Sequence, residues 1–186
     1  MSTLEEKVDK NFEGRKIREF LKEKMGLSSR LIKGASIDKR ILVNNTPVKM
    51  NYMLKENDEI VINLAKKESQ NIAPEKINLD IVYEDKDIIV INKSPNMVVH
   101  PTKRYQSGTL ANGLLYYFKE SKQDCIVRLV SRLDMDTSGL IIVAKNQYAH
   151  SELSNQMQNN NVEKRYLALV HGNFTEKEGT IDLPIY

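Results

Sequence analysis

The chain has 186 residues, of which 40% are hydrophobic and 28% are charged, with 28 basic and 25 acidic side chains. This length allows one compact domain and a small module, and it excludes a large multidomain assembly. The composition also excludes a disordered tail or a fibrous repeat, because the chain has enough apolar residues to bury a core.

Targeting signals and cysteine usage indicate where the protein works. The longest apolar run, residues 140–144, is far shorter than the ~20 residues that a membrane helix requires. The first ten residues carry charges where a secretory signal would be apolar. The single cysteine, Cys125, cannot form an internal disulfide and has no zinc-like spacing around it. We therefore expect a cytoplasmic protein with no membrane span and no metal site.

Basic residues are concentrated near the N-terminus. Residues 11–49 contain ten Lys or Arg side chains and four Asp or Glu side chains. Several such cations on one face would displace counterions from a nucleic acid strand and bind it in a salt-dependent way. The alternative is an ordinary solvated helix face, and charge alone does not separate the two.

Two helices are predicted within this basic region. Apolar residues at helical spacing predict a helix over residues 15–25, which Gly26 can end. A second helix follows, and either Ser28 or Ser29 can cap it. Its apolar residues lie on one side, so the basic residues Arg30 and Lys33 point outward.

Short strands complete this part of the chain. Residues 40–48 predict a hairpin that turns at Asn44 and Asn45, since Asn tolerates left-handed backbone angles. Residues 56–64 predict a closing strand. Two basic helices followed by short strands resemble the S4 RNA-binding domain over residues 12–65. The resemblance implies that the RNA-binding residues include Arg15, Arg30 and Lys33.

A second region follows a predicted linker. Residues 66–76 are polar, contain Pro74 and show no apolar period. From residue 77 onward, strand and helix patterns follow one another, which indicates an α+β fold. The expected elements are a hairpin over residues 79–91, a loop with Lys103 and Arg104, a helix over 109–119, a strand at 140–144, a helix over 148–161 and a strand over 164–172.

The most informative stretch is a polar loop that runs into the buried strand at residues 140–144. Arg132, Asp134 and Asp136 precede Gly139 in this loop. A carboxylate held beside a cation at a glycine-bearing turn suits a site that meets a phosphate or a base. The alternative is a structural turn in which the two carboxylates bind loop amides.

The string RLDMDTSGL at residues 132–140 is similar to the central motif of the RluA-like family of pseudouridine synthases. INKSPNMVVHP at residues 91–101 and KRYLALVHG at residues 164–172 resemble the family's flanking motifs. An S4 domain ahead of the catalytic region is the layout of one branch of that family. The resemblance implies an α+β fold: a small S4-type module, then part of a catalytic domain with a mixed or antiparallel sheet.

The resemblance also implies roles for single residues. Asp134 would be the catalytic residue, either as a nucleophile or as a base. Arg132 would fill the gap left by a flipped uridine, and the ring of Tyr166 would pack on that base. We expect Asp136 to cap the turn. The implied partner is RNA, ribosomal RNA first and transfer RNA second, with no cofactor, metal or obligate protein partner.

Two departures from the family pattern shape the hypotheses. Ser131 stands where the family most often has His, and the family's later Arg-containing motif is absent, so we expect residues 77–186 to be the N-terminal portion of the catalytic domain. The first hypothesis is therefore part of a pseudouridine synthase. The others are a catalytically inactive S4-type RNA-binding adaptor and a ribosome-associated S4 protein, and the RLDMDTSGL string disfavours the last.

Overall fold

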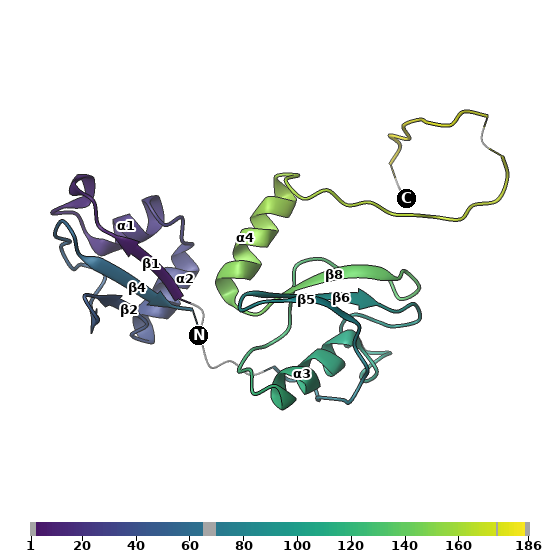
Figure 1. Cartoon of the computed structure of the whole chain (residues 1–186), viewed down its shortest axis with the longest axis horizontal. Coiled ribbons are helices and arrows are strands. Elements are labelled where there is room, and N and C mark those ends of the chain that lie inside the picture. Colours follow the sequence, from purple (N-terminus) through teal and green to yellow (C-terminus); the bar gives the residue numbers. More distant parts are fainter. Residues whose placement is uncertain (1–2, 65–69, 174, 185–186) are drawn as a thin grey trace.

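The computed structural model describes residues 3–64, 70–173 and 175–184. These residues form two antiparallel four-stranded sheets, each packed against helices around its own core (Figure 1). The predicted α+β class with an antiparallel sheet is therefore confirmed.

The first sheet has the order β1-β4-β2-β3, and all of its neighbouring strands are antiparallel. Its strands are β1 (Thr3–Lys7), β2 (Ile41–Val43), β3 (Thr46–Pro47) and β4 (Glu59–Asn63). Its helices are a 3-10 turn η1 (Lys10–Phe12), α1 (Ile17–Glu23) and α2 (Ser29–Ile37). Phe20 and Leu21 of α1 are fully buried together with Ile60 and Ile62 of β4, so the helices cover one face of this sheet.

Local signals in the sequence explain these boundaries. Gly26 has a φ of 64° and follows the end of α1. The Ser28 hydroxyl accepts a hydrogen bond of 3.3 Å from the Leu31 amide at the start of α2, which confirms the predicted cap. Asn44 and Asn45 have φ values of 48° and 63° between β2 and β3, as the predicted hairpin turn requires.

Strand β1 was not predicted. It pairs with β4 along its whole length, from Thr3 opposite Asn63 to Lys7 opposite Glu59, and Leu4 packs against the first core. Three of its five residues are charged, which hides the strand pattern. The first sheet therefore begins ahead of residue 12, while the predicted limits of the RNA-binding module stay a prediction.

The second sheet has the order β5-β6-β8-β7 and is also antiparallel. Its strands are β5 (Ile81–Glu84), β6 (Ile88–Lys93), β7 (Arg128–Leu129) and β8 (Gly139–Ala144), and its helices are α3 (Leu110–Glu120) and α4 (Gln147–Gln158). Buried residues of β6, β8 and α3 form one core, so α3 covers one face of the sheet (Figure 1). Thr109 and Asn112 cap α3 reciprocally.

Part of the predicted linker is fastened to this second sheet. Residues 66–69 lie outside the described residues, but Gln70 exchanges two hydrogen bonds with the backbone of Val127, at 3.2 and 3.0 Å. The Ala73 carbonyl accepts a bond of 2.8 Å from the Asn112 side chain. Residues 70–76 thus belong with the second body, and the linker limits remain a prediction.

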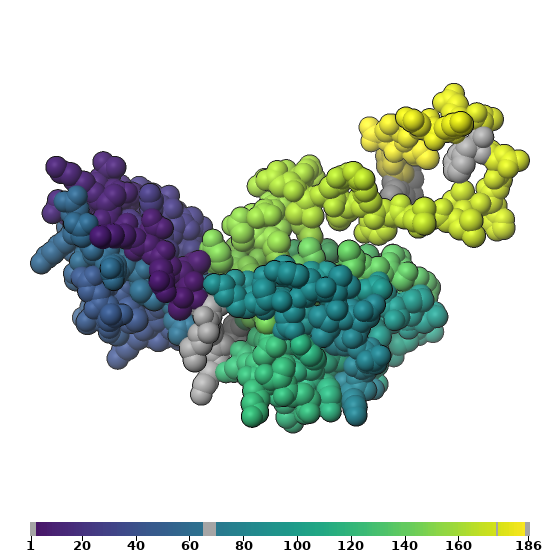
Figure 2. All heavy atoms as spheres, in the orientation of Figure 1, coloured from purple at the N-terminus to yellow at the C-terminus, as the bar shows by residue number. Residues whose placement is uncertain are grey.

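The predicted strand over residues 164–172 is wrong for this structure. The segment is extended but unpaired, and it leads away from the second sheet (Figures 1 and 2). Leu167 and Leu169 are 102% exposed, and Tyr166 is 66% exposed. A strand needs a neighbour for its amides and carbonyls, and no described residue pairs with this segment.

Candidate active site

The polar loop ahead of β8 is closed by a backbone hydrogen bond. The Thr137 amide donates to the Asp134 carbonyl at 3.2 Å, and Gly139 then enters the strand with a φ of 118°. The sequence predicted that the Asp136 side chain caps this turn. That prediction is wrong, because the carbonyl of Asp134 accepts the hydrogen bond that closes the turn. This geometry leaves the Asp134 carboxylate exposed at the mouth of β8.

A buried lysine fastens this loop to the neighbouring strand. Lys93 ends β6 and is only 1% exposed. Its Nζ donates to the carbonyl oxygens of Ser94 at 2.9 Å, of Met97 at 3.0 Å and of Met135 at 3.0 Å. The Met97 amide also donates to the Met135 carbonyl, at 3.2 Å. The residue next to Asp134 is therefore held by two donors from the β6 side.

The ammonium of Lys93 has its positive charge close to the two carboxylates of the loop. Burial lowers the pKa of Lys93, whereas the charges of Asp136 and Asp134 act in the opposite direction. The sequence contained Lys93 within the INKSPNMVVHP string, but nothing in its composition indicated a buried cation.

Asp134 and Arg132 line one hollow of about 490 Å³, which we call the Asp134 hollow. Its wall comes from two loops, the one that follows β6 and the one that precedes β8. The lining residues are Val98, Val99, His100, Pro101, Thr102, Arg104, Tyr105, Arg132, Leu133, Asp134 and Met135. The structure thus brings the predicted catalytic carboxylate and its predicted arginine together.

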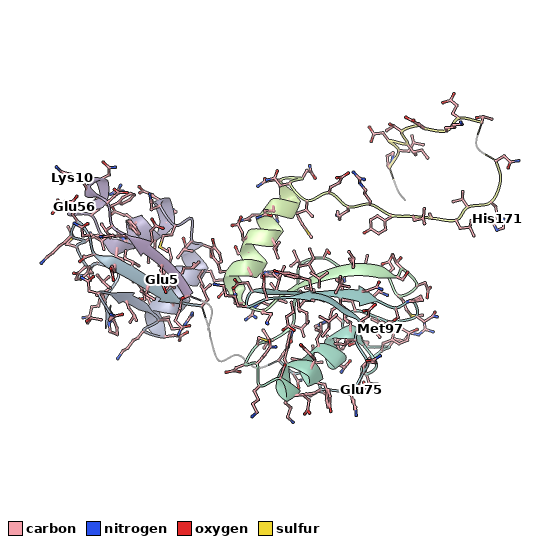
Figure 3. The ribbon with its side chains drawn as sticks, viewed as in Figure 1. Glu5, Lys10, Glu56, Glu75, Met97 and His171 are labelled. Carbon is pink, nitrogen blue, oxygen red and sulfur yellow. The ribbon has the colours of Figure 1, made fainter. Side chains whose placement is uncertain are left out.

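Tyr166 lies elsewhere. It lines a second hollow of about 850 Å³ with Asp136, Leu140 and Met157, between the open face of the sheet and the segment after α4. Asp134 is not among the residues that line it. In Figure 3, Met97 marks the loop that follows β6, and His171 marks how far the extended segment runs from it. The structure therefore does not bring Tyr166 and Asp134 together.

The three basic residues predicted in the first module differ in their surroundings. Arg15 bonds to Glu19 at 3.1 Å and to Glu23 at 2.8 Å, and its guanidinium lies 4.8 Å from the Phe12 ring centroid. The hydrogen bonds to these two carboxylates raise its pKa. Arg15 is thus engaged within the module rather than presented to a ligand.

Arg30 and Lys33 lie on α2 and are exposed. Lys33 borders a hollow of about 580 Å³ between α1 and α2, together with Arg18 and Lys22. The lining carries cations from both helices, the carboxylates of Glu19 and Glu23, and apolar side chains that include Ile32 and Met50.

In the part of the chain that the structure describes, no group of three or more metal-ligating side chains occurs. No helix there is long and apolar enough to cross a membrane. Burial raises the pKa of the Cys125 thiol to about 11, which makes it a poor nucleophile.

Comparison with family models gives matches to both bodies. Residues 87–186 match the RNA pseudouridylate synthase family, and residues 4–60 match the N-terminal domain of RluD ribosomal pseudouridine synthase. The first match includes the whole RLDMDTSGL loop and the Tyr166 segment. The second begins ahead of residue 12, in agreement with the position of β1.

Two curated relatives agree with these matches. RNA pseudouridine synthase YlyB of Bacillus subtilis is 42% identical over 80% of this chain and 50% of its own. Ribosomal large subunit pseudouridine synthase D of Escherichia coli is 37% identical over 96% of this chain and 55% of its own. A solved structure, human RNA pseudouridylate synthase domain containing 1, overlaps 44% of this chain and 28% of its own at 29% identity and a TM-score of 0.35.

The chain spans about half the length of the curated relatives it matches. Within that span, the family model covers more than half of the chain, including the loop of Asp134 and the strands on either side of it. The chain belongs to the RNA pseudouridylate synthase family.

Proposed function

We propose that the protein to which this chain belongs converts uridine in RNA to pseudouridine, with Asp134 as its catalytic carboxylate. One observation carries the proposal: Asp134 is exposed in a hollow with Arg132, on a loop fastened by the buried Lys93. Because relatives include an enzyme named for the large ribosomal subunit, ribosomal RNA is the proposed substrate, with transfer RNA next.

The proposed reaction is an isomerisation, in which the uridine loses and gains no atoms overall. The bond from uracil N1 to the ribose C1′ breaks, the base turns, a bond from C5 to C1′ forms, and the proton displaced from C5 is balanced by one gained at N1. A carboxylate can serve this sequence by attacking carbon or by taking a proton, and Asp134 has the exposure for either. Arg132 is proposed to occupy the space that the flipped uridine leaves.

Tyr166 is part of the same proposal, as the ring that packs on the flipped base. In the structure it lines a different hollow from Asp134. Its proposed role therefore requires residues 164–172 to approach the Asp134 hollow, and no strand pairing with the described residues holds this segment in place.

The synthase activity can be tested on a transcript of large-subunit ribosomal RNA. The full natural protein should create pseudouridine at specific uridines. After carbodiimide treatment, pseudouridine keeps an alkali-resistant adduct, which appears as a new stop in primer extension. The absence of new stops, together with tight RNA binding, would instead favour an RNA-binding adaptor without catalysis.

The first module is proposed to be an S4-type RNA-binding domain over residues 12–65. Replacing Arg30 and Lys33 of α2 with Ala should weaken RNA binding and lower the slope of log affinity against log salt by about 2, since each phosphate contact contributes about 1. Arg15→Ala should change the slope less, because Glu19 and Glu23 already neutralise that guanidinium.

A matched control is available on the same module. Lys7 and Lys10 are also exposed, but they lie on β1 and η1, and Figure 3 shows Lys10 at the outer end of the module. RNA affinity can be measured by fluorescence anisotropy at several salt concentrations. The double variant Lys7→Ala, Lys10→Ala should show the same slope of log affinity against log salt as the wild type. Equal slopes for the α2 variant and the wild type would show that Arg30 and Lys33 belong to an ordinary solvated helix face and do not bind RNA.

A further inference from the structure

One part of the Asp134 hollow has no role in the reaction described so far: the loop of residues 100–108. Its two ends are tied together, because the Leu110 amide donates to the Val98 carbonyl at 2.9 Å and the Ala111 amide donates to the Val99 carbonyl at 3.0 Å. The Gly108 amide donates to a Glu75 carboxylate oxygen at 2.7 Å. The loop therefore projects from two ends that hydrogen bonds hold in place.

The tip of this loop is built without the side chains of Arg104 and Tyr105. The Thr102 amide donates to the Tyr105 carbonyl at 2.8 Å, and the Tyr105 amide donates back to the Thr102 hydroxyl at 3.2 Å. These bonds use backbone atoms and Thr102 alone. The ring of Tyr105 and the guanidinium of Arg104 are thereby free to serve as a surface, 5.7 Å apart from ring centroid to guanidinium carbon.

Both side chains line the hollow that contains Asp134 and Arg132. Residues 100–108 include Lys103 and Arg104 and no acidic residue. Arg104 and Arg132 thus oppose a single carboxylate, Asp134, in the lining of this hollow. The loop supplies positive charge and one aromatic ring that is 38% exposed, which is the combination that single-stranded nucleic acid favours.

We propose that Arg104 and Tyr105 form a stacking platform for the nucleotide next to the uridine that is held at Asp134. The ring of Tyr105 supports the base, and Arg104 meets the adjoining phosphate. The target base has to reach the carboxylate of Asp134 on the loop before β8. The loop of residues 100–108 lines the same hollow, so it can support the nucleotide next to the target base. This inference rests on the proposed function, which supplies the RNA strand and the target uridine.

Stacking can be measured without turnover. A short oligouridine that carries a single 2-aminopurine loses fluorescence when that base stacks on an aromatic ring. The full natural protein should quench this probe, Tyr105→Phe should preserve the quench, and Tyr105→Ala should abolish it. Because the turn at residues 102–105 depends on Thr102 and the backbone, both variants should fold like the wild type.

Turnover gives the second measurement. Stacking of one base affects affinity by roughly 1–3 kcal/mol, so Tyr105→Ala should raise KM for RNA by about 5- to 150-fold while kcat stays within about threefold. Arg104→Ala should raise KM and reduce its salt dependence, whereas Arg104→Lys should restore the salt dependence only.

Tyr83 provides the control, since it is a 51% exposed tyrosine on β5 that bonds to Asp85 and lies outside the Asp134 hollow. Tyr83→Ala should match the wild type in both assays. Equal quench and equal KM for Tyr105→Ala and Tyr83→Ala would overturn the platform. A protein that quenches the probe through Tyr105 but makes no pseudouridine would refute the proposed function and leave the platform standing.

Discussion

Replacing Asp134 with Asn should reduce pseudouridine formation by about 10³-fold or more while leaving RNA affinity within about threefold of the wild type. Asn has nearly the same size and shape as Asp, but it can neither attack carbon as an anion nor accept a proton as a base. The Asp134 side chain is exposed, and the turn depends on its carbonyl rather than on its carboxylate, so the variant should fold normally.

Asp136 gives this experiment a control two residues away. It is also exposed and also close enough to influence Lys93, but it lines the hollow of Tyr166 instead of the Asp134 hollow. Asp136→Asn should therefore retain activity within about tenfold of the wild type. If the two variants lost activity equally, the effect would come from the charge of the loop and not from a catalytic carboxylate at Asp134.

Much of the fold followed from local chemistry. A serine before α2 and two asparagines between β2 and β3 each satisfied a specific backbone requirement, and they appeared in the structure where the sequence placed them. Such features depend on only a few neighbouring residues. They can be predicted without knowing which segments meet in space.

Other features depended on distant partners. The charged segment β1 is a strand because it pairs with β4, whereas its own sequence gives little sign of a strand. Residues 164–172 have the alternation of a strand but no neighbour to pair with among the residues that the structure describes, so the pattern alone was misleading. In both cases long-range pairing decided the outcome.

The residues of the candidate site also differ in whether local sequence or distant partners place them. Asp134 and Arg132 come from one contiguous string, so their shared hollow could be expected from the sequence. Tyr105 reaches the same hollow from a loop that begins some thirty residues earlier, and long-range pairing, including the ladder between β6 and β8, brings the two loops together. The sequence could identify the chemistry of the site but not the full set of residues around it.

Lys93→Met should lower kcat by about 100-fold with little change in KM, because a misplacement of roughly 1 Å in a catalytic group can have an effect of that size. The ammonium of Lys93 joins the carbonyls of Ser94, Met97 and Met135, and the last of these adjoins Asp134. Methionine fills similar space without donating, so the loop loses its charged donor while the core stays filled.

The same substitution should lower the free energy of unfolding by about 1–3 kcal/mol, as expected when buried carbonyls lose a charged donor. Urea unfolding with a core probe measures this, and kinetics below the unfolding transition separate it from the effect on kcat. Lys119→Met, at an exposed position near the end of α3, should change neither quantity. A variant at position 93 that lost stability but kept its kcat within about threefold would show that Lys93 supports the fold without positioning Asp134.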